Sequence, residues 1–131
     1  MEFLAVFAAA LASYVLGSIW YMTLAKPWMA ASGVPTTEDG KPANANNPML
    51  YIGAFVCALI VSGMMRHVFA LSGFDNIGEG LIAGLGIGLF LATPWIITNY
   101  SFASRPRALM VIDGGYATLG CTAMGAVHML F

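Results

Sequence analysis

The chain divides into four long apolar stretches separated by polar ones. The apolar stretches cover residues 3–24, 49–69, 77–101 and 107–130. A helix of about 20 residues crosses the roughly 30 Å hydrocarbon core of a bilayer, so each stretch is long enough to form one span. The pattern predicts an all-α polytopic membrane protein of one domain, a compact bundle of four transmembrane helices joined by two short turns and one longer polar loop.

The three connections differ in composition. Residues 30–47 are rich in Pro, Asn, Gly and Thr and show no apolar period, which predicts a polar loop. A plain connection is favoured there over a catalytic or partner-binding loop, because surface loops are ordinarily polar. Residues 72–75 and 104–107 are expected to form the two tight turns.

Several residues mark expected helix ends. We expect Lys26 and Pro27 to end the first span, because proline disrupts a helix interior. Pro48 suits the first turn of the second helix. Asn76 followed three residues later by Glu79 resembles a capping box at the start of the third.

Small side chains recur at every fourth position in the first and third stretches. They are Ala9, Ser13 and Gly17 in the first, and Gly80, Gly84, Gly88 and Ala92 in the third. This spacing places them on one helix face, where another helix can approach closely. We expect the two stripes to pack against each other or against a sister subunit. The glycines do not follow a strand, so they predict no dinucleotide-binding site.

Composition agrees with a membrane location. The 131 residues are 60% hydrophobic and 8% charged, whereas soluble domains have about 25% charged residues. The net charge of −1 argues against a nucleic-acid partner, which would need a basic face. The expected partners are the lipid bilayer and either further copies of this chain or other membrane subunits. Cys57 and Cys121 lie in apolar runs and are expected to be small packing residues.

The N-terminal stretch is expected to be a retained span. Its apolar run exceeds the 7–15 residues of a signal-peptide core, and no basic residue precedes it.

Basic residues predict the orientation. The first and third connections contain Lys26, Lys41, Arg105 and Arg107, and the opposite side contains Arg66. The positive-inside rule places residues 25–48 and 102–107 in the cytoplasm and both termini outside, in a membrane that we expect to be a bacterial inner membrane.

Asp113 is the main candidate for function. An Asp costs about 2.5–3.5 kcal/mol at the centre of a membrane helix, so it needs a partner or a purpose. It lies about 9 Å along the helix from Arg107, and Asn99 lies at a similar depth on the preceding helix, so the two could form a hydrogen bond. The expected polar cluster comprises Tyr21, Asn99, Tyr100, Arg105, Asp113 and Tyr116. It is either a protonatable or ligand-binding site, or a structural tie between helices.

The opposite end collects a second set of polar residues. Arg66, His67, Asp75, Glu79 and His128 fall there. Their spacing matches no recognised metal-ligand pattern, so an ion pair of Arg66 with Asp75 or Glu79 is favoured and no metal or cofactor is predicted. The chain contains no hydrolase, metalloprotease or P-loop signature, which argues against an enzyme.

Three segments together resemble a known family. They read LGSIWYMTLAKPWM, TPWIITNYSF and RPRALMVIDGGY. The chain resembles the domain-of-unknown-function 1761 family of small integral membrane proteins along nearly its whole length. The resemblance implies four helices, with polar features near the second hairpin, and it implies no reaction. Asn99 and Asp113 fall in the segments that carry it.

Three functions remain open. The favoured one is a small oligomeric transport or channel module, because a single four-helix chain is thin for enclosing an aqueous path. The alternative is a structural or regulatory subunit that packs against a larger membrane complex. An enzyme that acts on lipid or quinone is the least favoured, because no nucleophile with its base is visible.

Overall fold

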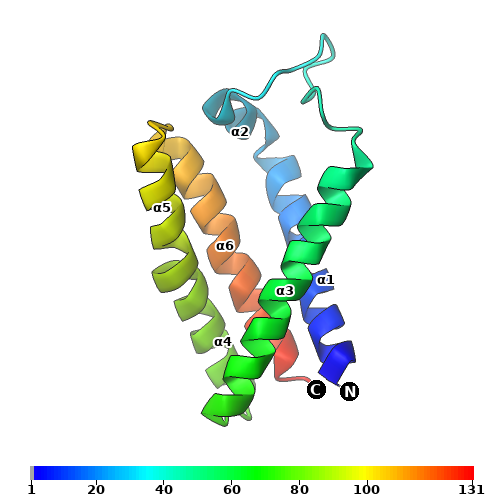
Figure 1. The fold of residues 1–131 in the computed structure, drawn as a ribbon, viewed down its shortest axis with the longest axis vertical. Coiled ribbons are helices and arrows are strands. Elements are labelled where there is room, and N and C mark those ends of the chain that lie inside the picture. The colour runs from blue at the N-terminus through cyan, green and yellow to red at the C-terminus, as the bar shows by residue number, and fades with distance from the viewer. Residues whose placement is uncertain (1) are drawn as a thin grey trace.

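The computed structural model describes residues 2–131 and is built of helices (Figure 1). They are α1 (Glu2–Thr23), α2 (Ala25–Ser32), α3 (Pro48–Ser72), α4 (Ile77–Gly86), the π-helical turn η1 (Ile87–Ala92), α5 (Thr93–Phe102) and α6 (Arg107–His128). The predicted all-α class is confirmed. Because α4, η1 and α5 follow one another without a break, they act as one long helix.

Three helices are long and apolar enough to cross a membrane. They are Glu2–Thr23, Pro48–Ser72 and Ile77–Phe102. α6 was expected as the fourth span and is as long as α1, at 22 residues, but it does not reach the same apolarity. Glycines, threonines and Asp113 dilute its apolar residues. Length and apolarity therefore indicate three spanning helices where the sequence pattern predicted four.

The first helix does not end at Pro27 as expected. Instead, α1 ends at Thr23, and Pro27 lies in the first turn of the short helix α2. Proline is tolerated there because a first-turn N–H has no intrahelical acceptor. Gly33 ends α2 in the left-handed conformation, with φ of 67°. The polar loop thus begins about three residues later than expected.

The predicted helix starts at Pro48 and Asn76 are confirmed. Pro48 occupies the first turn of α3, and the Asn47 side chain accepts a hydrogen bond from the Met49 N–H. At α4, Asn76 accepts from the Glu79 N–H at 3.0 Å. Glu79 in turn accepts from the N–H of Asp75, one residue before the expected position. The sequence of both connections therefore sets where the next helix begins.

α6 lies at the centre of the bundle. α1 packs along one side of it and α4, η1 and α5 along the other, whereas α3 packs mainly on α1 (Figure 1). The two termini lie together at one end of the bundle, which we call the terminal end, and the polar loop lies at the other, the polar-loop end. The fold thus brings α1 and α5 to the polar face of α6.

The two stripes of small residues do not pack against each other. On α4 and η1, Gly80, Gly84 and Gly88 lie against the α6 backbone, at Gly125, Cys121 and Thr118 respectively. On α1, Ser13 and Gly17 also meet α6, at Gly120 and Tyr116. α6 can be approached from two sides because it has small residues of its own. Ala9 is fully buried and Ala92 is half-buried.

Apolar side chains form one small core and cover most of the outer surface. The core joins α1, α3 and α6 through Ala9, Ala10, Ala58, Met65, Phe69, Cys121 and Met124. Cys121 is buried as expected, but Cys57 is exposed. Large apolar side chains on every long helix are also exposed. A surface of this kind is stable in lipid and would be unfavourable in water.

The π-helical turn η1 ends two residues before Pro94. Proline has no N–H to donate, and π turns occur where the regular bonding pattern is interrupted. Thr93 compensates here: its N–H and its hydroxyl both donate to the Gly88 carbonyl, the hydroxyl at 2.7 Å. The long third span therefore stays continuous through the proline.

Candidate functional site

A single carboxylate lies between three helices near the polar-loop end. Asp113 of α6 accepts a hydrogen bond at Oδ1 from the hydroxyl of Tyr21 on α1, 2.6 Å away. It accepts a second bond at Oδ2 from the hydroxyl of Tyr100 on α5, 2.5 Å away. Tyrosines from two different helices therefore hold the two oxygens of one side chain. We call Tyr21, Tyr100 and Asp113 the Asp113 cluster.

A second layer of side chains holds α1 against α6 beside this cluster. The indole N–H of Trp20 donates to the Ile112 carbonyl at 2.9 Å. The ring of Tyr116 packs edge to face on Tyr21, with centroids 5.5 Å apart, and its hydroxyl donates to the Ser13 carbonyl at 3.2 Å. These contacts fix the position of Tyr21 relative to α6.

Gly17 makes room for the Tyr116 ring. A Cβ at Gly17 would come within 2.7 Å of two ring atoms of Tyr116, closer than carbon atoms pack. The small residue on α1 is therefore required for the aromatic side chain on α6 to reach Ser13. The stripe of small residues on α1 therefore both packs against α6 and leaves space for the Tyr116 side chain.

Two residues that were expected in the cluster lie elsewhere. The Asn99 side chain is exposed and forms no hydrogen bond with any part of residues 2–131, so the expected bond to Asp113 is absent. Asn99 and Tyr100 are successive residues on a helix, about 100° apart, and it is Tyr100 that faces α6. Arg105 donates to the Ser32 carbonyl and so ties the α5–α6 turn to the end of α2.

The Asp113 carboxylate has binding capacity left. An ionised carboxylate has about four lone-pair positions, and the two tyrosines use two of them. Within residues 2–131, the ion pair that forms is between Arg66 and Glu2, and Asp113 has no cationic partner. Within these residues, the hydrogen-bond donors to the Asp113 carboxylate are therefore the hydroxyls of Tyr21 and Tyr100. A proton, a small cation or an ammonium group is the chemistry that this arrangement can bind.

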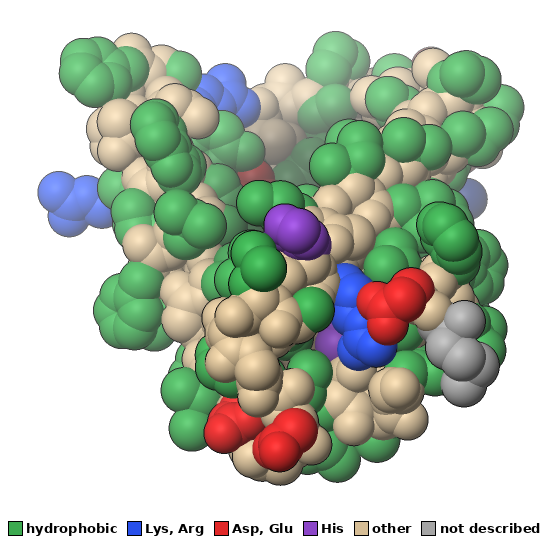
Figure 2. All heavy atoms as spheres, turned by 60° about the horizontal axis from the view of Figure 1, so that its bottom comes forward, with side chains coloured by type: hydrophobic (Ala, Val, Ile, Leu, Met, Phe, Trp, Pro, Cys, Tyr) green, Lys and Arg blue, Asp and Glu red, His purple; other side chains and the backbone are tan. Residues whose placement is uncertain are grey.

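A second polar cluster lies at the terminal end, which Figure 2 brings forward. Arg66 of α3 forms a two-pronged ion pair with Glu2 of α1, with N···O distances of 2.9 and 2.7 Å, and also donates to the His128 carbonyl at 2.8 Å. The predicted pairing of Arg66 with Asp75 or Glu79 is therefore wrong. Asp75 and Glu79 are instead occupied with capping α4. In the sequence, the signal for the correct pairing was that both termini were expected on the side of Arg66.

His128 is the innermost member of this terminal cluster. Its side chain is fully buried, and Nε2 lies 3.1 Å from the Ser62 hydroxyl, which donates to the Val6 carbonyl. Nδ1 forms no hydrogen bond within residues 2–131. Among these residues, no three His, Cys, Asp or Glu side chains meet as a metal site would require. Through these hydrogen bonds the cluster joins α1, α3 and α6.

The fold and the two polar clusters define a small helical membrane protein. Its sequence places it in a family: residues 4–129 match the family described as protein of unknown function (DUF1761). The chain belongs to this family, and the family resemblance that the sequence motifs indicated is confirmed. No curated protein and no solved structure matches the chain.

Proposed function

We propose that the protein is a small homo-oligomeric transport module in which Asp113 binds the transported proton or cation. The observation that supports this is the Asp113 cluster: a half-buried carboxylate, held by tyrosines from two other helices, without a cationic partner within residues 2–131. Ionisable residues at membrane depth are costly and mark ion pathways and proton relays.

The proposal includes α6 as a fourth span. Its 22 residues correspond to about 33 Å of helix, enough to cross the hydrocarbon core. Its lower apolarity suits a central position, because α1 and the α4–α5 helix cover its polar positions. Four spans also suit two termini at one end of the bundle.

The proposed orientation follows the basic residues. Lys26, Lys41, Arg105 and Arg107 belong to the polar-loop end, and the one basic residue of the helices at the terminal end, Arg66, is paired with Glu2. The positive-inside rule then puts the polar-loop end in the cytoplasm. Asp113 would lie in the cytoplasmic third of the membrane, within reach of ions from that side.

Flux through reconstituted vesicles tests the transport function. Proteoliposomes with the purified protein should dissipate an imposed proton, sodium or potassium gradient faster than empty vesicles. Asp113→Asn should abolish this flux, and Asp75→Asn, which removes an exposed carboxylate at the far end, should leave it intact. Absence of flux under every gradient, with folded protein in the membrane, would eliminate the proposal.

A structural or regulatory subunit is the second candidate, and one feature favours it. α3 packs mainly on α1, and its outer face is apolar and exposed at Ile52, Val56, Ile60 and Met64. A larger membrane protein could dock there. Purification from native membranes in mild detergent distinguishes the two candidates: a stoichiometric second protein supports the subunit, and a homo-oligomer alone supports the transport module.

A further inference from the structure

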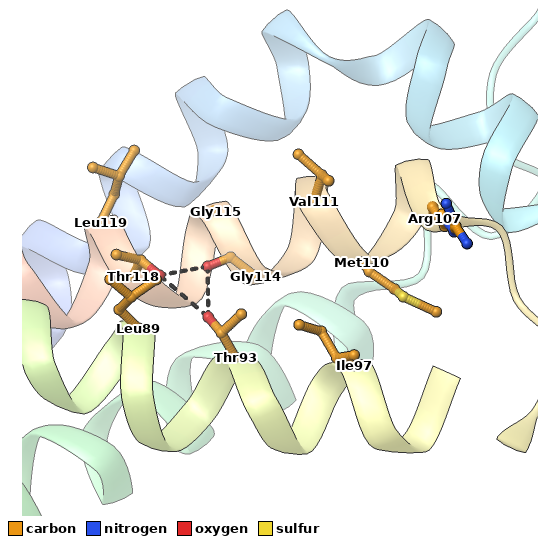
Figure 3. A pocket seen from close by; sticks show the side chains of 10 residues that line it. All are labelled: Leu89, Thr93, Ile97, Arg107, Met110, Val111, Gly114, Gly115, Thr118 and Leu119. Carbon is orange, nitrogen blue, oxygen red and sulfur yellow. Dashed lines mark hydrogen bonds between the residues drawn. The ribbon is translucent and has the colours of Figure 1, made fainter. Parts of the chain in front are cut away.

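An apolar groove runs between α5 and α6 on the outside of the bundle (Figure 3). Its volume is about 460 Å³, and its walls are formed by Leu89, Ile97, Val111 and Leu119. Gly114 and Gly115 also line it; a Cβ at Gly114 would collide with Thr93 of α5 and one at Gly115 with Trp20 of α1, so both glycines allow these helices to pack closely on α6 beside the groove. It is separate from the Asp113 cluster, whose members do not line it.

The polar groups in the groove are already satisfied by the protein. The Thr93 hydroxyl donates to the Gly88 carbonyl at 2.7 Å. It also lies 3.1 Å from the Gly114 carbonyl, to which the Thr118 hydroxyl donates at 2.8 Å (Figure 3). They therefore offer little hydrogen bonding to a ligand. A hydrocarbon chain suits this surface better than a polar solute.

Arg107 lies at one end of the groove, at the level where α6 begins (Figure 3). Its side chain is exposed and forms no hydrogen bond or ion pair with any other of the residues 2–131. From Arg107 to Leu119 the groove follows 12 residues of helix, about 18 Å. That is close to half of a 30 Å hydrocarbon core, the depth of one leaflet.

We propose that this groove binds an anionic membrane phospholipid, with an acyl chain along α5 and α6 and the phosphate on Arg107. The guanidinium group can pair with a phosphate through two parallel hydrogen bonds. Basic pockets between membrane helices on the cytoplasmic side bind anionic headgroups in this way. The site is independent of ion binding at Asp113.

A second, smaller groove leaves room for another acyl chain. It lies between α1 and α6, has a volume of about 240 Å³, is lined by Leu16, Trp20 and Leu24, and shares Leu119 with the first groove. The two grooves therefore meet on the same face of α6. A phospholipid with two chains fits this arrangement better than a single helix from a partner would.

Lipid retention measured by native mass spectrometry tests the proposal. Protein in mild detergent is mixed with phosphatidylglycerol or with phosphatidylcholine of the same chain length. The wild type should retain phosphatidylglycerol about fivefold more, the effect of one basic residue near a lipid surface. Arg107→Gln should remove this preference, and Arg107→Lys should largely keep it. Lys26→Gln, which removes an exposed charge outside the groove, should have no effect.

A second variant tests the groove itself. Val111 is 72% exposed, so Val111→Trp should fill the groove without disturbing the core, and it should reduce retention of both lipids. A phosphatidylglycerol preference that survives Arg107→Gln would overturn the proposal, as would unchanged lipid retention in folded Val111→Trp.

The remaining occupant to distinguish is a second copy of this chain. Val111→Cys in a Cys57→Ser background should form no disulfide-linked dimer through position 111 under oxidising conditions in vesicles if lipid fills the groove. Efficient formation of a disulfide-linked dimer through this position would show that protein occupies it and would overturn the proposal.

Discussion

Gly80 of α4 and Gly125 of α6 lie backbone to backbone where their helices cross, so close that a Cβ on either one would collide with the carbonyl group of the other. The same contact repeats one turn further on, between Gly84 and Cys121. Close approach of this kind replaces the hydrophobic driving force that is missing between helices in lipid.

This crossing makes the glycines unequal in their tolerance of substitution. Gly80→Ala should destabilise the protein by about 1–3 kcal/mol, because backbone atoms on α6 cannot move aside. Gly86→Ala in the same helix should be nearly neutral, because no atom lies within 4 Å of its Cβ position. Thermal unfolding in detergent measures both, and equal effects at the two positions would contradict the crossing.

The two tyrosines of the Asp113 cluster should contribute separately to stability. Tyr21→Phe and Tyr100→Phe should each cost about 1.5 kcal/mol, high for a membrane hydrogen bond because the acceptor is charged. Tyr14→Phe, which removes an exposed bond of 3.3 Å, is the control and should cost little. A double-mutant cycle with Asp113→Asn checks the assignment: no coupling between tyrosine and acid would show that the bonds do not stabilise the fold.

Thr93 should matter more than Thr98, the other threonine of α5. Thr93→Val removes the hydroxyl that serves the Gly88 and Gly114 carbonyls and should cost about 1 kcal/mol. Thr98→Val, at an exposed position, should be neutral. Unfolding by denaturing detergent compares the two. If Thr93→Val is as stable as the wild type, the π-helical turn does not depend on this side chain.

Arg66 should be more important than its ion-pair partner. Arg66→Gln removes both the pair with Glu2 and the hydrogen bond to the His128 carbonyl, so it should lower the melting temperature clearly. Glu2→Gln should have a smaller effect that shrinks further at high salt, because Glu2 is 68% exposed and water screens the pair. Melting curves at low and high NaCl provide the measurement. An equal fall in melting temperature for both variants would mean that Arg66 stabilises the protein through the ion pair with Glu2 and not through its hydrogen bond to His128 of α6.

Helix positions could be predicted from the sequence because they depend on local signals. Long apolar runs identify spans, and Pro48 and Asn76 mark helix starts by their own chemistry. The prediction that Pro27 ends the first helix was wrong because a proline can also lie in the first turn of a new helix. Which of the two occurs depends on whether the chain bends before the proline.

The level of a residue along the bundle was also predictable, but its rotation about the helix axis was not. Counting residues from the α5–α6 turn places Tyr100 and Asp113 at one level. The same count admits Asn99, which faces outward. Rotation is set by packing, and here a π-helical turn lies upstream of these residues and changes the phase of the helix.

The helix against which each stripe of small residues packs could not be predicted from the sequence either. Gly17 and Gly84 lie in similar stripes, and either could have met the other. The pairing depends on which helix can be approached from both sides. That is α6, where Gly114, Gly120 and Gly125 are buried.

The central place of α6 has a consequence for biogenesis. It follows α1–α5 along the chain, and a chain emerges from the ribosome with its N-terminal part first. Until α6 is synthesised and packs into the bundle, Tyr21 and Tyr100 lack their acceptor, and the glycine face of α4 lacks its partner, although α1 and α3 can already pair. Insertion and assembly are therefore separated in time. Before its central helix arrives, the bundle lacks most of the contacts that join its helices.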